Sequence, residues 1–209
     1  MIDYLNTAQS MDRNIGRVLD YLKANNLEQN TIVIYLSDQG FYMGEHGWFD
    51  KRFMYQESFR TPFIMKYPAL IKNGAHTDAS IVNADVAPTL LELAGVKKPN
   101  DMQGKSFVPV LKSATKEHRK QIFYHYFENG EHAVSPHFGV KEGCYKLIRF
   151  YKRVESWELF DLQNDPQELK NVYDDPKYKG IVKKMRKALL KQIKEFDDKE
   201  AEIIFHKKI

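Results

Sequence analysis

The sequence has few of the features that would assign it to a specialised class of protein. It contains one cysteine, Cys144, which excludes an internal disulfide and gives no indication of the redox state of its compartment. No apolar run approaches the ~20 residues that a membrane-spanning helix needs. The first residues, MIDYLNTAQSMDRN, show no basic segment followed by an apolar one. We therefore expect a soluble chain that has no signal peptide and does not enter a membrane.

Charge of one sign is also scarce. The 32 Lys and Arg residues nearly balance the 28 Asp and Glu residues, which leaves a net charge of +4. No basic block is longer than a pair such as Lys183-Lys184, whereas nucleic-acid binding normally requires a concentrated basic patch. We expect no nucleic-acid partner. What the chain does have is 209 residues, 43% of them hydrophobic, which is enough to bury a core.

The first part of the chain has the pattern of an α/β protein. Ile15, Val18, Leu19 and Leu22 follow the spacing of one helix face, and this predicts a helix that stops at the following pair of asparagines. Residues 31–37, TIVIYLS, form a β-branched and nearly continuous apolar run. Such a run is typical of a strand that is buried on both faces, as in a parallel sheet covered by helices.

Further elements extend this layer. Residues 61–67 and 80–82 predict strands, and residues 85–95 predict a complete short helix in which Asp85 is the N-cap. Alternating strands and helices indicate an α/β layer over residues 1–112.

The second part, residues 113–209, has a different character. A polar connector at 113–119 precedes four aromatic-rich segments that are separated by turns and not by helices. This order predicts an antiparallel meander. The predicted strands are residues 121–127, 138–141, 145–151 and 157–162. Residues 178–199 predict a long amphipathic helix that packs on this sheet.

One loop gathers several chemical types in a short space: SDQGFYMGEHGWFDKR, which starts at residue 37. Asp38 directly follows the predicted strand of residues 31–37, the place where ligand groups gather in open α/β sheets. Asp38 and Gln39 offer oxygen donors that suit Ca²⁺. Taken singly, Asp38 is more often a turn cap, His46 a structural residue and Lys51 a solvated charge. Together, in a loop with glycines, they indicate a site for a metal and an anion.

The segment SDQGFYMGEHGWFDKRFMYQESFRTPFIMKYP resembles the metal-and-sulfate loop of the type I sulfatases, members of the alkaline-phosphatase-like superfamily. Four further stretches resemble this family in the correct order. They are SMDRNIGRVLD, VNADVAPTLLELAG, MQGKSFVPVLK and a last group, PHFGV, YKLIRFY and WELFDLQNDPQELKN. The resemblance implies a partial alkaline-phosphatase-like α/β sheet layer, followed by a small C-terminal antiparallel sheet with a long packing helix.

The resemblance also implies roles for individual residues. Asp38 and Gln39 correspond to calcium ligands, although many family members have Asn or His in place of this Gln. Lys51 corresponds to the lysine that contacts the substrate sulfate. His46 lies where a catalytic or substrate-contacting histidine enters the pocket, and His137 corresponds to a residue that binds the sugar or leaving group.

The nucleophile of the family is not in this sequence. Sulfatases form it as formylglycine from a Cys/Ser-x-Pro-x-Arg motif, but Cys144 is followed by Tyr-Lys-Leu-Ile and Ser58 by Phe-Arg-Thr-Pro. The resemblance therefore covers only the C-terminal portion of a sulfatase, and formylglycine and the remaining calcium ligands are expected in an N-terminal part. We expect this chain alone to be inactive, and to self-associate or to pair with that N-terminal half.

The expected substrate is a sulfated carbohydrate or an aryl sulfate ester, and the resemblance implies a periplasmic, extracellular or lysosomal location. One alternative is a phosphodiesterase or phosphomutase relative, which would normally show an Asp-His-Gly sequence and further His and Asp ligands. A second alternative is a non-catalytic interaction or sugar-binding module. The missing nucleophile supports it, whereas the presence of Asp38, His46 and Lys51 argues against it.

Overall fold

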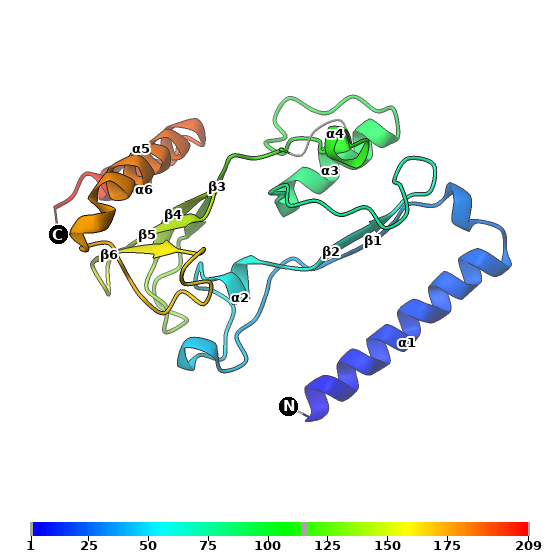
Figure 1. Ribbon diagram of the computed structural model, residues 1–209, viewed down its shortest axis with the longest axis horizontal. Coiled ribbons are helices and arrows are strands. Elements are labelled where there is room, and N and C mark those ends of the chain that lie inside the picture. The colour runs from blue at the N-terminus through cyan, green and yellow to red at the C-terminus, as the bar shows by residue number, and fades with distance from the viewer. Residues whose placement is uncertain (1, 114–116, 209) are drawn as a thin grey trace.

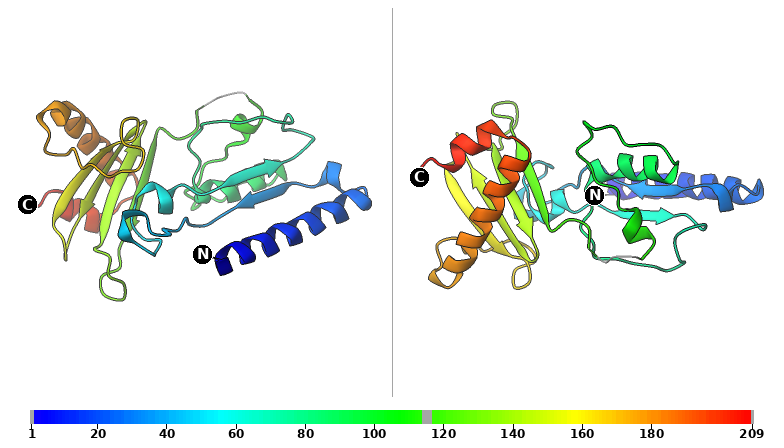
Figure 2. Two further views of the ribbon diagram at one scale, coloured as in Figure 1. Left: turned by 60° about the horizontal axis from the view of Figure 1, so that its bottom comes forward. Right: turned by 90° about the horizontal axis from the view of Figure 1, so that it is seen from above.

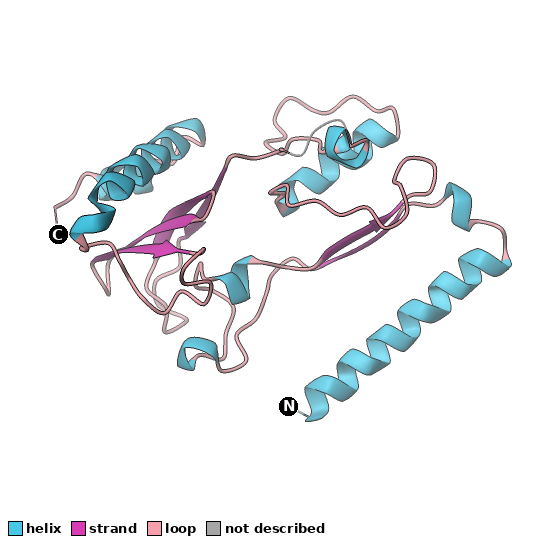
Figure 3. Cartoon of the chain, viewed as in Figure 1, coloured by secondary structure: helices cyan, strands magenta, loops and turns pink. Residues whose placement is uncertain are grey.

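The computed structural model describes residues 2–113 and 117–208 and contains two separate sheets (Figures 1 and 3). The helices are α1 (Ile2–Ala24), α2 (Gln56–Phe59), α3 (Val86–Leu93), α4 (Val108–Leu111), α5 (Lys179–Glu195) and α6 (Lys199–Phe205). The strands are β1 (Val33–Leu36), β2 (Phe63–Lys66), β3 (Gln121–Tyr126), β4 (His137–Glu142), β5 (Tyr145–Phe150) and β6 (Ser156–Asp161). The predicted connector at 113–119 includes residues 114–116, which lie outside the described residues.

The first sheet consists of β1 and β2, which pair antiparallel from Val33 opposite Lys66 to Leu36 opposite Phe63. The parallel arrangement predicted for the strand at 31–37 is therefore wrong. So is its predicted burial on both faces, since Tyr35 and Leu36 are 43% and 39% exposed. Such an apolar run is normally covered on both faces, but every residue of β1 is at least partly accessible in the structure.

The predicted strand at 80–82 is absent, whereas the helix predicted for residues 85–95 is present as α3. The amide of Val82, which a strand would use in its ladder, donates to the carboxylate of Asp85 at 3.2 Å. Asp85 is the N-cap residue of α3, as predicted, but no capping hydrogen bond joins this helix to its carboxylate. The carboxylate is fully buried and accepts two hydrogen bonds from Arg119, at 2.7 and 2.5 Å, and one from the amide of Lys105 at 2.8 Å.

The predicted first helix is present as α1, which ends at Ala24 before Asn26 takes a positive φ of 57°. None of its residues is buried, and the helix lies apart from the four-stranded sheet (Figure 1). Among the described residues, no helix is both long enough and apolar enough to cross a membrane.

The second sheet has the strand order β3-β4-β5-β6, with antiparallel pairing throughout, as the meander prediction required. Figure 2 shows α5 lying across one face of this sheet. There Met185, Leu189 and Ile193 pack against strand residues such as Leu147 and Leu159, all at most 1% exposed. The helix predicted for 178–199 ends at Glu195, and α6 begins after a break at which Asp198 caps its first turn.

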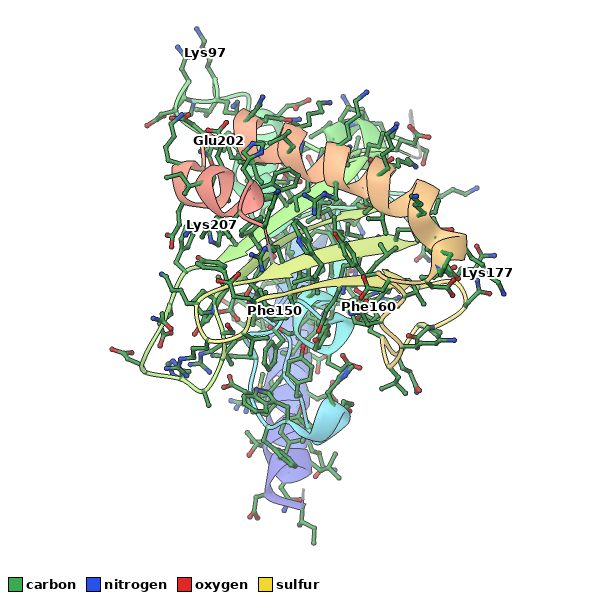
Figure 4. The ribbon with its side chains drawn as sticks, turned by 90° about the vertical axis from the view of Figure 1, so that its left-hand side faces the viewer. Lys97, Phe150, Phe160, Lys177, Glu202 and Lys207 are labelled. Atoms are coloured by element: carbon green, nitrogen blue, oxygen red, sulfur yellow. The ribbon has the colours of Figure 1, made fainter. Side chains whose placement is uncertain are left out.

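The opposite face of this sheet is covered by residues 53–59, which precede β2 in the chain. Met54 is fully buried there against Ile148, Phe150 and Phe160. Figure 4 shows Phe150 and Phe160 on the side of the sheet away from α5. Gly139 makes room for Met54, because an added Cβ at position 139 would lie 2.7 Å from Met54 Sδ. The C-terminal sheet therefore shares a core with a segment of the first part.

Candidate functional site

The site loop, residues 37–52, follows β1 and folds back onto α2. The amide of Gly40 donates a hydrogen bond to the carbonyl oxygen of Ser58 at 2.9 Å. An added Cβ at Gly40 would lie 1.9 Å from the carbonyl oxygen of Glu57, so only glycine permits this approach of two backbones. The polar residues that follow β1 are thereby fixed against residues 57 and 58.

Gln39 and Lys51 are brought together by Ser58. Gln39 Nε2 lies 2.9 Å from the carbonyl oxygens of Lys51 and Ser58 and 2.5 Å from Ser58 Oγ. Ser58 Oγ in turn donates to the Lys51 carbonyl at 2.6 Å. Carbonyl oxygens only accept hydrogen bonds, so the amide nitrogen of Gln39 faces them. This leaves Gln39 Oε1 without a hydrogen-bond partner among residues 2–113 and 117–208.

The side chains of Asp38 and Lys51 are left free while their backbones are held. Asp38 is exposed, and its carbonyl oxygen accepts a hydrogen bond from Asn83 Nδ2 at 2.8 Å. Lys51 is also exposed, with its carbonyl held by Gln39 and Ser58. Neither side chain has an ion-pair partner in the described part of the chain. A carboxylate, an amide oxygen and an ammonium group therefore remain available after β1.

His46 is the residue of the site loop that contacts Tyr55 and Glu57 at the start of α2. Its backbone has a positive φ of 54°, which is uncommon for a residue other than glycine. The ring stacks on Tyr55 with 4.7 Å between centroids, and Nε2 lies 3.4 Å from Glu57 Oε2. The side chain is 15% exposed. His46 thus contacts residues on either side of Gln56, but makes no hydrogen bond with the predicted metal ligands or the lysine.

His137 is fully buried at the start of β4. Its Nδ1–H donates to the carbonyl oxygen of Ser135 at 2.9 Å, and its ring centroid lies 4.8 Å from that of Phe150 and 5.6 Å from that of Tyr124. Nε2 has no hydrogen-bond partner among the described residues. Burial lowers the pKa of His137 to about 4, so the ring is neutral near pH 7. Its sugar-binding role stays a prediction, and it would require the aromatic cover to open.

A chain of charged groups starts beside Lys51 and ends on the loop between β3 and β4. Arg52 pairs with Asp50, and Arg52 Nη2 lies 2.6 Å from His132 Nε2. His132 Nδ1 lies 2.6 Å from Glu128 Oε1. The loop between β3 and β4 therefore contacts the residue that follows the predicted sulfate lysine, and the C-terminal sheet is part of the surroundings of the site.

A buried ion pair holds residues 53–59 on the C-terminal sheet. Lys146 Nζ lies 2.6 Å from Glu168 Oε1, and both side chains are fully buried. Lys146 also donates to the carbonyl of Met54 at 2.7 Å, and Glu168 Oε2 accepts from the amide of Gln56 at 2.6 Å. Burial lowers the pKa of Lys146 to about 8 and raises the pKa of Glu168, while their mutual attraction opposes both shifts.

The sequence indicated the polar groups of the site but not the residues that hold them. Ser58 fails the formylglycine pattern and gives no other signal in the sequence. Glu168 follows the sequence Asn164-Asp165-Pro166, which is typical of a turn, and charged side chains are usually exposed there. Lys146 offers one usable signal, because it shares a face of a predicted strand with Ile148 and Phe150. A charge on an apolar face indicates a buried partner.

The fold is found in proteins of the sulfatase class. The chain is 44% identical over 214 residues to an N-acetylglucosamine-6-O-sulfatase of Bacteroides thetaiotaomicron, covering 99% of this chain and 38% of that protein. It is 32% identical over 196 residues to an arylsulfatase of Clostridium perfringens, covering 91% and 39% respectively. A solved structure of a protein in complex with its substrate, D-glucosamine-2-N,6-O-disulfate, matches with a TM-score of 0.92 and 43% identity, covering 99% and 42%.

The particular family is identified by a match that covers most of the chain. Residues 44–195 match the family described as N-sulphoglucosamine sulphohydrolase, C-terminal. The chain therefore belongs to this sulfatase family, which confirms the predicted membership. The predicted α/β architecture with a small antiparallel sheet and a long helix is confirmed as well. The chain spans 38% to 39% of the length of the two sulfatases it matches.

Proposed function

We propose that this chain is the C-terminal part of an enzyme that hydrolyses a sulfate ester of a carbohydrate, with an amino sugar as the first candidate. The observation that carries the proposal is the hydrogen-bonded unit of Gln39, Lys51 and Ser58, which fixes the amide of Gln39 and the backbone of Lys51 next to each other after β1. Similarity to an N-acetylglucosamine-6-O-sulfatase supports the carbohydrate class. Similarity to an arylsulfatase makes an aryl sulfate the second substrate to test.

The donors after β1 fit part of a calcium shell. The carboxylate of Asp38 is exposed, and Gln39 Oε1 is the one atom of its amide that the loop does not use. Ca²⁺ takes six to eight oxygen ligands, so these two residues would supply a minority and the others would come from outside these 209 residues. A bound Ca²⁺ would supply positive charge for the sulfate oxygens.

Lys51 and His46 would act on the substrate itself. Negative charge develops on the sulfate oxygens during cleavage, and an ordered lysine ammonium group aimed at them stabilises that charge. His46 Nε2, which faces Glu57 at 3.4 Å, would contact the substrate or carry a proton. His137 would bind the sugar or leaving group. The nucleophile, formylglycine in this family, would come from outside these residues, because no Cys/Ser-x-Pro-x-Arg motif occurs among them.

We further propose that the apolar face of α1, β1 and β2 packs against the remaining part of the enzyme. Val18 and Tyr21 on α1 are 60% and 63% exposed, and Ile64 on β2 is 65% exposed. Large apolar side chains that are this exposed on several elements are expected at an interaction surface. Where that part is missing, we expect self-association through the same face, measurable by light scattering over a range of protein concentrations.

The proposal is tested by a chimaera. This chain replaces the matching C-terminal portion of the Bacteroides thetaiotaomicron N-acetylglucosamine-6-O-sulfatase, and sulfate release is measured with Ca²⁺ from 6-O-sulfated N-acetylglucosamine and from a chromogenic aryl sulfate. We expect no turnover by the chain alone and turnover of the sugar sulfate by the chimaera. A folded chimaera that releases no sulfate from either compound would overturn the proposal, as would turnover by the chain alone.

Two variants of the chimaera show whether the predicted residues carry the activity. Lys51→Ala is expected to lower kcat/KM by about 100-fold or more, since removal of one preorganised charge-stabilising group commonly costs 10²–10³. The matched control is Lys97→Ala, a surface lysine distant in sequence from the site loop (Figure 4). It is expected to leave kcat/KM unchanged. Equal effects of the two substitutions would contradict the role of Lys51.

A further inference from the structure

We infer that Ser58 is a positioning residue that orients the predicted calcium ligand Gln39 and the predicted sulfate lysine Lys51 together. The inference rests on the proposed function for the roles of these two residues, but the contacts stand independently of it. Ser58 has no place in the nucleophile chemistry of the family, since its sequence context lacks the required Pro and Arg. It touches neither metal nor sulfate through its own hydroxyl group, because that group is already used inside the protein.

The hydroxyl group of Ser58 is shared between the two residues. Oγ donates its proton to the carbonyl of Lys51 at 2.6 Å and accepts from Gln39 Nε2 at 2.5 Å. The carbonyl of Ser58 accepts a second contact from the same Nε2 at 2.9 Å and also the amide of Gly40. One buried residue thus fixes the amide plane of Gln39 from two sides while it holds the backbone of Lys51.

Burial makes this contact difficult to replace. Ser58 is 1% exposed, so solvent has little access to the position of its hydroxyl group. The backbones at Gly40 and Glu57 approach so closely that an added Cβ would be 1.9 Å from a carbonyl oxygen. The two N–H groups of Gln39 Nε2 are shared among three acceptors, namely Ser58 Oγ and the carbonyl oxygens of Ser58 and Lys51. In Ser58→Ala only the two carbonyl oxygens would remain, and the Lys51 carbonyl would lose one of its two donors. The amide would then rotate more freely, and Oε1 would spend less time in the orientation that a metal requires.

The first test uses the 209-residue chain without metal and reads the side-chain amide of Gln39 by ¹⁵N NMR. Its signal is assigned by its loss in Gln39→Glu. We expect slow hydrogen exchange of this amide in the parent chain and roughly tenfold faster exchange in Ser58→Ala, because the shortest of its three acceptor contacts is removed. Unchanged exchange in Ser58→Ala would overturn the inference whatever the activity of the chimaera.

Ser135→Ala is the matched control. Ser135 is a second buried serine, 6% exposed, whose hydroxyl group donates to the carbonyl of Tyr151 at 2.8 Å and accepts from the amide of Val154 at 3.1 Å. The substitution therefore removes a comparable pair of hydrogen bonds from the C-terminal sheet without touching Gln39 or Lys51. We expect a similar loss of thermal stability but no change in the exchange of the Gln39 amide. Equal acceleration in both variants would show a general loosening and would also overturn the inference.

The second test uses the chimaera and separates the inference from the proposed function. Ser58→Ala is expected to raise the Ca²⁺ concentration needed for half-maximal activity by roughly tenfold, whereas Ser135→Ala leaves it unchanged. An inactive chimaera with a protected Gln39 amide would reject the function and retain the positioning role of Ser58. An active chimaera whose Ca²⁺ requirement is the same in Ser58→Ala and the parent would reject the positioning role alone.

Discussion

Helices α1 and α5 have similar amphipathic sequences and very different surroundings. Helix α1 runs for 23 residues and buries none of them. Helix α5 runs for 17 residues and buries Met185, Ala188, Leu189, Gln192 and Ile193. The apolar stripe of α5 is covered by a sheet from the same chain, whereas the stripe of α1 faces solvent. An amphipathic pattern therefore predicts that a helix will form, but it does not say whether the partner surface belongs to the same polypeptide.

The same contrast extends to the two sheets. The strands β1 and β2 are covered so thinly that Tyr35, Leu36 and Ile64 are 39% to 65% exposed. In the four-stranded sheet, Leu147, Ile148 and Leu159 are completely buried, and both faces are packed. We therefore expect the C-terminal sheet to carry most of the folding stability of the isolated chain.

The largest effect is expected from Lys146→Ala, which leaves the charge of Glu168 buried and unpaired. Loss of one partner of a buried ion pair typically costs about 3–5 kcal/mol. Chemical denaturation followed by circular dichroism measures the change, with Lys184→Ala as the control because Lys184 pairs with Glu142 from a 58% exposed position. The double substitution Lys146→Met with Glu168→Leu is expected to recover most of the loss. A loss under about 1 kcal/mol in Lys146→Ala would show that residues 53–59 do not depend on this pair.

Leu189→Ala is expected to cost about 3 kcal/mol in the free energy of unfolding. Its side chain is completely buried between α5 and the sheet, and such leucine-to-alanine changes remove packing and leave a cavity. The measurement is the denaturant midpoint at constant slope. A change below about 1 kcal/mol would mean that the core under α5 is not the main source of stability, and the comparison between the two regions would fail.

Acid is expected to destabilise the chain through His137. Its pKa is about 4 in the folded state against 6.5 for an unperturbed histidine. The unfolded chain therefore binds a proton below pH 6.5 that the folded chain accepts only near pH 4. Stability that is complete above pH 6.5 is lost as the pH falls through this window, by about 2 kcal/mol between pH 7 and pH 5. His137→Asn should remove this component of the slope, and an unchanged slope would contradict it.

The smallest effect is expected from Leu19→Ala on α1, which changes the same side chain in the same way as Leu189→Ala. Leu19 is 39% exposed and touches no buried core, so the unfolding free energy of the isolated chain should change by less than about 0.5 kcal/mol. In the chimaera the same substitution should cost about 1 kcal/mol or more, because α1 would be covered there. An equal cost in both proteins would show that α1 gains no partner.

The C-terminal sheet could be predicted well because each strand pairs with its neighbour in sequence. Turns such as the one at Gly143, with φ of 58°, connect β4 to β5 and fix the register locally. The pairing of β1 with β2 could not be predicted in this way. These strands are separated by the whole site loop and α2, and the apolar run in β1 indicated burial without indicating a partner. Residues 80–82 were predicted as a strand for the same reason, because a short apolar run does not show whether a partner strand lies beside it.

The site shows a similar division. Some of its residues are indicated by the sequence pattern, whereas others are recognised only from the packing of the folded chain. Asp38, Gln39, His46 and Lys51 could be proposed from the sequence because their chemical types are unusual together after an apolar strand. Ser58 could not, since its contribution depends on a hydroxyl group that reaches Gln39 across a sequence separation of 19 residues. The chemical types of the side chains can be read from a sequence. The residues that hold those side chains in position can be identified only when the structure shows which distant segments are in contact.

The contacts of residues 54 and 56 have a consequence for the order of events during synthesis. The carbonyl of Met54 accepts a hydrogen bond from Lys146, which follows it by 92 residues in the sequence. The amide of Gln56 donates to Glu168, which follows it by 112 residues. At translation speeds of about 5–20 residues per second, the partner of Gln56 is added on the order of ten seconds after Gln56 itself. The residues predicted to bind metal and sulfate are thus all present early, but Lys146 and Glu168, which anchor residues 53–59 on the C-terminal sheet, are translated late. A chain that ended before residue 168 would contain Asp38, Gln39 and Lys51. It would lack Glu168, and so the buried ion pair that holds residues 53–59 on the C-terminal sheet could not form.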